Sequence, residues 1–342
     1  MHKFDHIGAL YQVARYVDSV NGDGECPERY KVRSAVAYRG SVKLHGCNAG
    51  VACSTERLSP QSRSRTVSVE DDNYGFAEFV SREPVARAIR AIERRIRSEH
   101  AVADESIVVL YGEWIGPGIQ RGVAINSLPS RQWVLFAVKV VEGEESRIID
   151  ALPSLEDTYA DEAIFSVVDA GFFELSVDFA DNTSKEDALA YAMRLTADVE
   201  SGCPWAKRFG VSGAGEGIVW VPVGAHWGNT SLVFKTKGEK HKNTKTKRSK
   251  VQISPEVLRS IAAFVEFAVT ENRLGQGIES TKELGHAIEM RSMGTFLKWV
   301  AQDVRRECAL DLEASQLEWK DVSKAVTQKA RSFFVEHVHR GL

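Results

Sequence analysis

The chain has 342 residues, of which 43% are hydrophobic and 27% charged, and this is the composition of an ordinary globular protein of one or two domains. The formal net charge of −3 excludes a global electrostatic attraction to nucleic acid, so any such binding must use a local patch. No run of residues approaches the apolar length of a membrane span, and the first residues lack the basic-then-apolar pattern of a secretory signal.

The first predicted elements lead to a lysine. Apolar residues at helical spacing predict a helix over residues 4–19, with Asp5 as its N-cap. A short strand follows and ends near Lys43. Lys43 and His45 project to one face, because side chains repeat every two residues along a strand, and Asn48 follows closely. A lone Lys-x-x-Gly is expected by chance in a chain of this length, so this motif alone does not distinguish a nucleophile from a surface lysine.

Polar residues and a basic helix occupy the next part of the chain. Residues 54–66 carry Arg63 and Arg65, which suit either a solvated basic loop or a phosphate or ribose contact through the planar guanidinium fork. Residues 83–99 predict a basic amphipathic helix.

Two continuous apolar runs predict buried strands. Residues 107–111 form the first, and a Gly/Pro loop over residues 112–120 follows it, with Glu113 at the strand end. A carboxylate in this position is as common in structural roles as in functional sites. Residues 133–138 form the second strand, and core packing is the simpler interpretation of its Phe136.

Two further strands are predicted after an amphipathic helix over residues 185–201. They cover residues 215–222 and 232–237, and the second contains Lys235 and Lys237. Two lysines spaced by two residues share one strand face, where they repel each other unless solvent screens them or an anion lies between them. A nucleoside triphosphate is one such anion.

The last third of the chain is predicted to be helical. The segment 235–250 is strongly basic, and Ser254 then caps a helix that Gly275 can end. No strand is predicted after residue 253. We therefore predict an α+β protein, with antiparallel sheets flanked by helices in residues 1–248 and a small all-α domain in residues 249–342.

Taken in order, the polar motifs resemble those of the covalent nucleotidyltransferases, which include ATP-dependent DNA ligases, RNA ligases and mRNA capping enzymes. Within this superfamily the chain looks like the RNA ligase 2 family of nick-sealing RNA ligases. The residues that carry the resemblance are Lys43-Leu44-His45-Gly46-Cys47-Asn48, Arg63, Tyr111-Gly112-Glu113, Phe136, Glu216-Gly217 and Lys235-Thr236-Lys237. The more specific marks are Lys-x-His-Gly-x-Asn and the Gly-Glu-Trp-Ile-Gly-Pro-Gly-Ile-Gln loop. Cys47 stands where a threonine or another small residue is expected, and Arg65 competes with Arg63 for the family's arginine.

The resemblance implies a nucleotide-binding set within an N-terminal nucleotidyltransferase domain. The set comprises Lys43, His45, Asn48, Arg63, Glu113, Phe136, Glu216, Lys235 and Lys237. Lys43 would take AMP as a lysyl-AMP, and Lys235 and Lys237 would hold the α-phosphate and stabilise its transition state. The helical C-terminal domain would engage RNA.

The resemblance also assigns roles to the other members of this set. Glu113 would bind the ribose hydroxyls and Phe136 would stack on adenine. Glu216 would hold the metal ion, directly or through water. Arg63 would act near the ribose or the RNA end.

The implied reaction joins RNA 3′-OH and 5′-phosphate ends through lysyl-AMP and RNA-adenylate, with ATP and Mg²⁺ or Mn²⁺, in nick sealing or RNA repair. We expect a cytoplasmic protein, or one of the host cytoplasm if the chain is phage-encoded, because five scattered cysteines fit a reducing compartment. We also expect a monomer without a membrane partner. A capping guanylyltransferase or a small DNA ligase is the alternative within the superfamily, although those enzymes usually carry a β-barrel domain after the last motif. A non-catalytic RNA-binding module is the alternative from another class, and the intact polar set argues against it.

Overall fold

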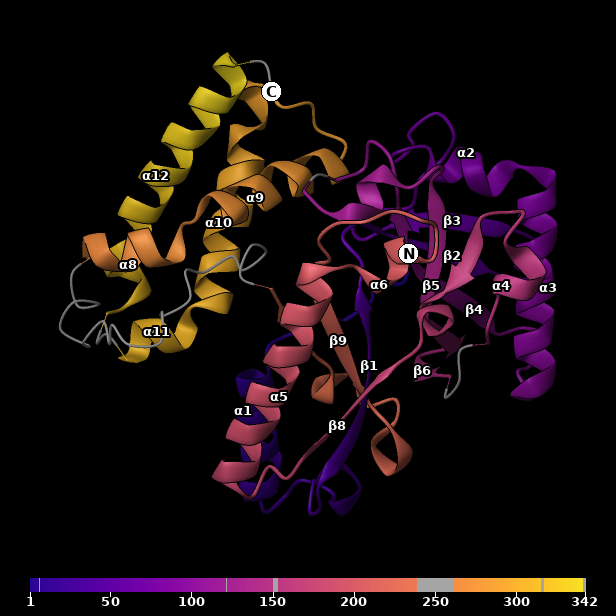
Figure 1. The fold of residues 1–342 in the computed structure, drawn as a ribbon, viewed down its shortest axis with the longest axis horizontal. Helices are drawn as coiled ribbons and strands as arrows, with labels where there is room; N and C mark the ends of the chain where they lie inside the picture. Colours follow the sequence, from indigo (N-terminus) through magenta and orange to yellow (C-terminus); the bar gives the residue numbers. More distant parts are fainter. Residues whose placement is uncertain (6, 121, 150–152, 239–260, 315–316, 341–342) are drawn as a thin grey trace. The chain divides into compact units, whose positions relative to one another are not determined.

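A computed structural model describes residues 1–342 apart from residues 6, 121, 150–152, 239–260, 315–316 and 341–342. The chain divides into two compact units, Met1–Gly238 and Glu239–Leu342. The predicted domain boundary at residues 248/249 and the predicted cap Ser254 lie outside the described residues. The predicted α+β class is confirmed, because unit 1 contains two sheets with flanking helices and the described part of unit 2 is helical (Figure 1).

Two largely antiparallel sheets form the frame of unit 1. The four-stranded sheet has the order β10-β9-β1-β8, and its strands are Phe234–Lys237, Gly217–Pro222, Val36–Lys43 and Phe173–Val177. The six-stranded sheet has the order β3-β2-β4-β5-β6, with strands Leu58–Ser62, Cys47–Cys53, Ile107–Ile115, Gln132–Glu142 and Glu145–Ile148; β7, Ile164–Ser166, pairs with β5 in parallel. The chain passes from the first sheet to the second between Lys43 and Cys47, so the candidate nucleophile lies where the two sheets meet.

Each sheet of unit 1 has its own helices. Helices α1, Leu10–Gly22, and α5, Asn182–Ser201, pack with the four-stranded sheet, whereas α2, Phe76–Ser81, and α3, Glu83–Glu99, cover the six-stranded one (Figure 1). The short helices are α4, Glu156–Tyr159, and α6, Pro204–Lys207, with 3₁₀ turns at Glu28–Tyr30, Ala124–Ser127, Val167–Ala170, Gly224–His226 and Thr230–Leu232. The predicted helix over residues 83–99 is therefore confirmed, and that over residues 185–201 begins three residues earlier.

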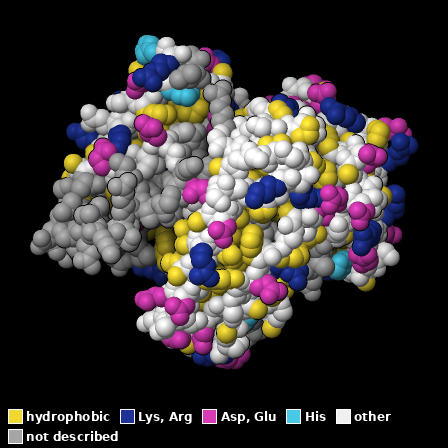
Figure 2. All heavy atoms as spheres, viewed as in Figure 1, with side chains coloured by type: hydrophobic (Ala, Val, Ile, Leu, Met, Phe, Trp, Pro, Cys, Tyr) yellow, Lys and Arg dark blue, Asp and Glu magenta, His cyan; other side chains and the backbone are white. Residues whose placement is uncertain are grey.

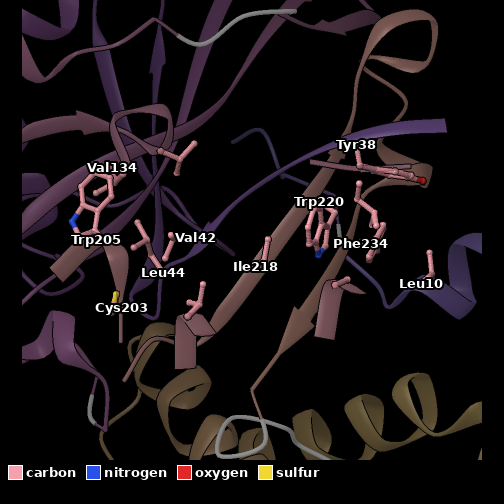
Figure 3. Close-up of a cluster of buried hydrophobic side chains, with 14 of the residues drawn as sticks. Leu10, Tyr38, Val42, Leu44, Val134, Cys203, Trp205, Ile218, Trp220 and Phe234 are labelled. Atoms are coloured by element: carbon pink, nitrogen blue, oxygen red, sulfur yellow. The ribbon is translucent and has the colours of Figure 1, made fainter. Parts of the chain in front are cut away.

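Alternation along the strands separates a buried face from a polar one. Val42, Ile218 and Phe234 point into the core beneath the four-stranded sheet (Figure 3). Their neighbours in sequence, including Lys43 and Lys235, therefore lie on the opposite face. Over the described surface drawn in Figure 2, basic and acidic side chains are interspersed, in keeping with the small net charge.

Two sequence predictions in unit 1 are wrong in ways that concern the site. The first helix begins at Leu10 rather than near residue 4, and Asp5 accepts a hydrogen bond from Thr230 Oγ1 instead of capping the helix. The strand predicted to end at residue 111 continues to Ile115, so Glu113 lies inside β4 and not in a loop. Tertiary partners accompany both differences: Thr230 engages the Asp5 side chain, and pairing with β2 and β5 extends β4 past the apolar run.

The described part of unit 2 is a helical bundle around one apolar core. Its helices are α8 Ile261–Ala268, α9 Glu271–Glu283, α10 Met293–Glu307, α11 Ala309–Ala314 and α12 Trp319–His339, with a 3₁₀ turn at Met290–Ser292. The predicted end at Gly275 is wrong, because Thr270 caps α9 through the Arg273 N–H and the helix continues past the glycine. Among the helices that the structure describes, none combines the length and apolar character that a bilayer span requires.

Candidate active site

The ends of three strands bring the predicted lysines together. Lys43, the last residue of β1, pairs with Gly217 at the start of β9, and Lys237, the last residue of β10, pairs with the same glycine from the other side. A Cβ atom on Gly217 would lie 2.0 Å from the Thr236 carbonyl oxygen, so only glycine permits this approach of β9 to β10. The two lysines therefore flank one backbone position, and the predicted common face of Lys235 and Lys237 follows from the register.

One carboxylate lies at the centre of these basic side chains. Lys43 Nζ is 2.6 Å from Glu216 Oε2, and His45 Nδ1 is 3.2 Å from the same oxygen. Lys237 Nζ is 3.1 Å from the other oxygen, Oε1. The Glu216 side chain is 1% exposed, whereas those of the three basic residues are 15–21% exposed. Burial alone raises the pKa of Glu216, but the charges of Lys43, Lys237 and His45 outweigh it and hold that pKa well below its usual value.

A second carboxylate, that of Glu113, contacts the segment that connects β1 to β2. Glu113 Oε1 accepts a hydrogen bond of 3.0 Å from the Gly46 N–H. Burial raises the pKa of Glu113 to about 7, although the charge of Lys43 opposes this shift. The site thus holds one ionised carboxylate, Glu216, and one, Glu113, that titrates near neutrality. The basic side chains around them outnumber these two carboxylates. This balance favours the binding of a polyanion.

Hydrogen bonds and close packing fix the backbone of Gly46. Its N–H donates to Glu113, and its carbonyl oxygen accepts from Gln120 Nε2 at 3.3 Å. An added Cβ atom would lie 2.2 Å from the Trp114 carbonyl oxygen. The sequence predicts a loop at Gln120 and no role for its side chain, because no local pattern shows that its amide reaches back to Gly46.

Phe136 lies at an irregularity of β5. Tyr111 pairs with Ala137 and Gly112 pairs with Leu135, which leaves Phe136 without a partner in β4. Such a bulge turns an additional side chain to one face of the sheet. Phe136 is half-buried there, beside the buried Tyr111. The bulge brings Phe136 and the next residue, Ala137, into one small apolar cluster with Tyr111, and the Phe136 ring keeps part of its surface exposed there.

The two candidate arginines have different surroundings. Arg65 contacts Asp71 Oδ2 at 2.5 Å and donates to the carbonyl oxygens of Asp71 and Asp72. These contacts stabilise the loop in which Arg65 itself lies. Arg63 is exposed at the end of β3. Of the two, Arg63 keeps the accessibility that a ligand contact needs. Asn48 is half-buried in β2, directly opposite Glu113 in the register.

A divalent cation would fit this site only together with a phosphate ligand. Within the ranges that the structure describes, no three His, Cys, Asp or Glu side chains gather into a metal-binding group. Magnesium commonly uses one or two carboxylates and completes its shell with water and substrate phosphates. Glu216 provides one such carboxylate, so the residues present are compatible with a nucleotide-bound cation.

The region that carries this site matches a known protein family. The model of a family described as RNA ligase matches residues 37–237, which is more than half of the chain. Solved structures of Naegleria gruberi RNA ligase variants are also similar: one with AMP and Mn has 15% identity and a TM-score of 0.41, and one with ATP and Mn has 16% and 0.44. Each match covers 70% of this chain and 56% of the Naegleria chain. TM-scores of this size do not establish a shared fold, so the assignment rests on the family match. No curated protein matches the chain significantly.

Proposed function

The chain belongs to the RNA ligase family, and from this premise we propose that it is an ATP-dependent RNA ligase that seals nicks or repairs broken RNA through lysyl-AMP and RNA-adenylate intermediates. The observation that carries the proposal is the convergence of Lys43, Lys237 and Glu216 within the family-matched region. Glu216 is 173 positions from Lys43 in sequence, and both lysines lie within hydrogen-bond distance of its carboxylate.

The first step would form a bond between Lys43 Nζ and the α-phosphorus of ATP and break the bond to pyrophosphate. A protonated lysine has no electron pair for this attack, so Lys43, which is 21% exposed, must first release a proton to solvent. Glu216 Oε2, 2.6 Å away, is the group that holds this ammonium in place before the nucleotide arrives. The bound triphosphate offers Lys43 and Lys237 new negative partners in place of Glu216.

Negative charge on the reacting phosphoryl group would be stabilised by Lys235 and Lys237. Their shared face directs both toward the side of the sheet where Lys43 lies. Fixed positive groups that meet developing charge lower the barrier more than they strengthen substrate binding. A bound Mg²⁺ or Mn²⁺, held by Glu216 and the phosphates, would neutralise further phosphate charge. Glu113 would accept the ribose hydroxyls and Phe136 would stack on the base.

The AMP would then move to an RNA 5′-phosphate, and attack by a 3′-hydroxyl would release it. Arg63 is accessible for a contact to the RNA end. We propose that the helical domain, residues 249–342 in the sequence prediction, grips RNA during these later steps and that the protein acts as a monomer.

Transfer of radiolabel from α-labelled ATP in the presence of magnesium tests the proposal. We expect a labelled protein band that survives denaturation for the wild type and for the control Lys207→Ala, whose lysine is exposed, and none for Lys43→Ala. GTP should give no label. Protein that has been freed of pre-bound AMP and still takes no label from either nucleotide would contradict the proposal and favour the RNA-binding module. Label from GTP alone would favour a guanylyltransferase.

A further inference from the structure

The segment before α1 joins the two sheets of unit 1. We call its residues 2–5 and 7–8 the strap. At one end, Gln61 in β3 makes two hydrogen bonds with the His2 backbone, accepting from its N–H at 3.0 Å and donating to its carbonyl oxygen at 2.6 Å. The Tyr111 hydroxyl donates to the carbonyl oxygens of His2 and Lys3, at 3.1 and 3.4 Å. The strap is thus attached to the six-stranded sheet through its main chain.

The other end of the strap is attached to the four-stranded sheet. Asp5 Oδ2 accepts from Thr230 Oγ1 at 2.7 Å, just before β10. The Gly8 carbonyl oxygen accepts from the Lys235 N–H at 2.9 Å, and Gly8 forms a parallel bridge with Phe234. The strap therefore ends beside a lysine that the proposed function assigns to the phosphates.

Between these attachments, the Phe4 ring lies against the aromatic pair at the bulge. Its centroid is 5.2 Å from that of Phe136, with the ring planes 79° apart, and 5.1 Å from that of Tyr111, at 60°. Tyr111 is fully buried and hydrogen-bonded to the strap, so its ring is fixed. Phe136 is only half-buried, and in β4 it has no paired residue. Among the residues that the structure describes, Phe4 and Tyr111 are the aromatic rings beside Phe136, so Phe4 limits the orientation of that ring.

We infer that Phe4 is a positioning residue for the nucleotide base, which acts by holding the Phe136 ring in the orientation that receives a purine. The inference rests on the proposed function, in which Phe136 stacks on adenine. Edge-to-face contacts have a preferred geometry, so they fix a ring orientation as well as burying area. Because main-chain hydrogen bonds and Asp5 attach the strap, a change at Phe4 leaves its attachments in place.

The test compares Phe4→Ala and Phe4→Leu with Phe4→Tyr and Lys3→Ala. Leucine retains an apolar side chain without a ring, tyrosine retains the ring, and Lys3 is an exposed side chain on the same strap. Initial rates of lysyl-AMP formation are measured against ATP concentration. We expect the alanine and leucine variants to raise KM for ATP about tenfold, as loss of two aromatic contacts implies, with kcat within about twofold of wild type. The tyrosine and Lys3 variants should match the wild type.

Binding of ATP to the same variants in a Lys43→Ala background, measured by calorimetry, gives the comparison without chemistry. Kd should rise by the same factor as KM. An unchanged Kd in Phe4→Leu would overturn the inference, and a lower Kd would show instead that Phe4 competes with the base for Phe136. If the wild type forms no lysyl-AMP, the proposed function fails, and the calorimetric series still decides the role of Phe4.

Discussion

Replacement of Glu216 by glutamine removes the negative charge on which three basic groups converge. The amide keeps the shape of the side chain and one acceptor oxygen. Lys43, Lys237 and His45 would then lie within 2.6–3.2 Å of a neutral group that is 1% exposed. The unfolded chain has no such cluster, so we expect a loss of folding free energy as well as of lysyl-AMP formation.

The size of the loss follows from burial. Removing one partner of a fully buried ion pair costs about 3–5 kcal/mol, because the remaining charge has no compensation. Here the basic side chains retain 15–21% of their surface, and water can stabilise them in part. We therefore expect Glu216→Gln to lower the free energy of unfolding by about 2–3 kcal/mol at pH 7.

The pH dependence has a definite sign. The folded-state pKa of Glu216 lies well below its ordinary value of 4.5. Its stabilising contribution is therefore complete above that ordinary value and is lost as the pH falls through the depressed pKa. The difference between wild type and Glu216→Gln should be large at pH 7 and should shrink toward pH 3.

Urea denaturation followed by tryptophan fluorescence measures this difference, since urea is uncharged and leaves ion pairs unscreened. Glu174→Gln is the matched control, because Glu174 is an exposed residue of the same sheet. It should change stability by less than about 0.5 kcal/mol. A Glu216→Gln protein as stable as the wild type at pH 7 would refute the reasoning and show that the cluster makes no net contribution.

Three other outcomes are expected. Gly46→Ala should cost about 1–3 kcal/mol in urea unfolding and impair lysyl-AMP formation, because its Cβ atom would meet the Trp114 carbonyl oxygen; Gly294→Ala, where nothing lies within 4 Å, should be tolerated, and equal effects would contradict the packing argument. The pKa of Glu113 is raised to about 7, so between pH 4.5 and 7 wild type should lose on the order of 1–3 kcal/mol relative to Glu113→Gln, the lower end applying if solvent reaches the carboxyl group; parallel stability curves would disprove this. Deletion of residues 251–342 should leave lysyl-AMP formation intact and impair sealing of nicked RNA, and normal sealing by the shortened protein would exclude a role for these residues in sealing.

Local sequence patterns predicted the elements whose partners are close in the chain. The helix over residues 83–99 has an apolar face at helical spacing, and the structure places it at Glu83–Glu99. Local patterns also predict strands β9 and β10 and the common face of Lys235 and Lys237. The described helices of unit 2 agree with the prediction of no strand after residue 253.

The elements that the sequence did not reveal depend on distant partners. Strand β3 lies in a polar stretch whose composition predicts a loop, but its backbone pairs with β2 from Ala49 to Cys53. Helical periodicity begins at residue 4, yet Gln61 and Tyr111 bind the backbone of His2 and Lys3, and Thr230 binds the Asp5 side chain, just before a helix that starts only at Leu10. In both cases tertiary hydrogen bonds outweigh local preference.

By itself, the sequence determined which chemical groups this protein possesses: a lysine at a strand end, two lysines on one strand face, and carboxylates beside glycines. Only the tertiary structure decided that Lys43, Lys237 and His45 share the carboxylate of Glu216, that Glu113 lies within a strand, and that the Phe136 ring contacts Phe4 of the strap. The physical reason is that strand register and sheet-to-sheet packing join residues far apart in the chain. Side-chain periodicity shows which face a residue occupies but not which residue it meets.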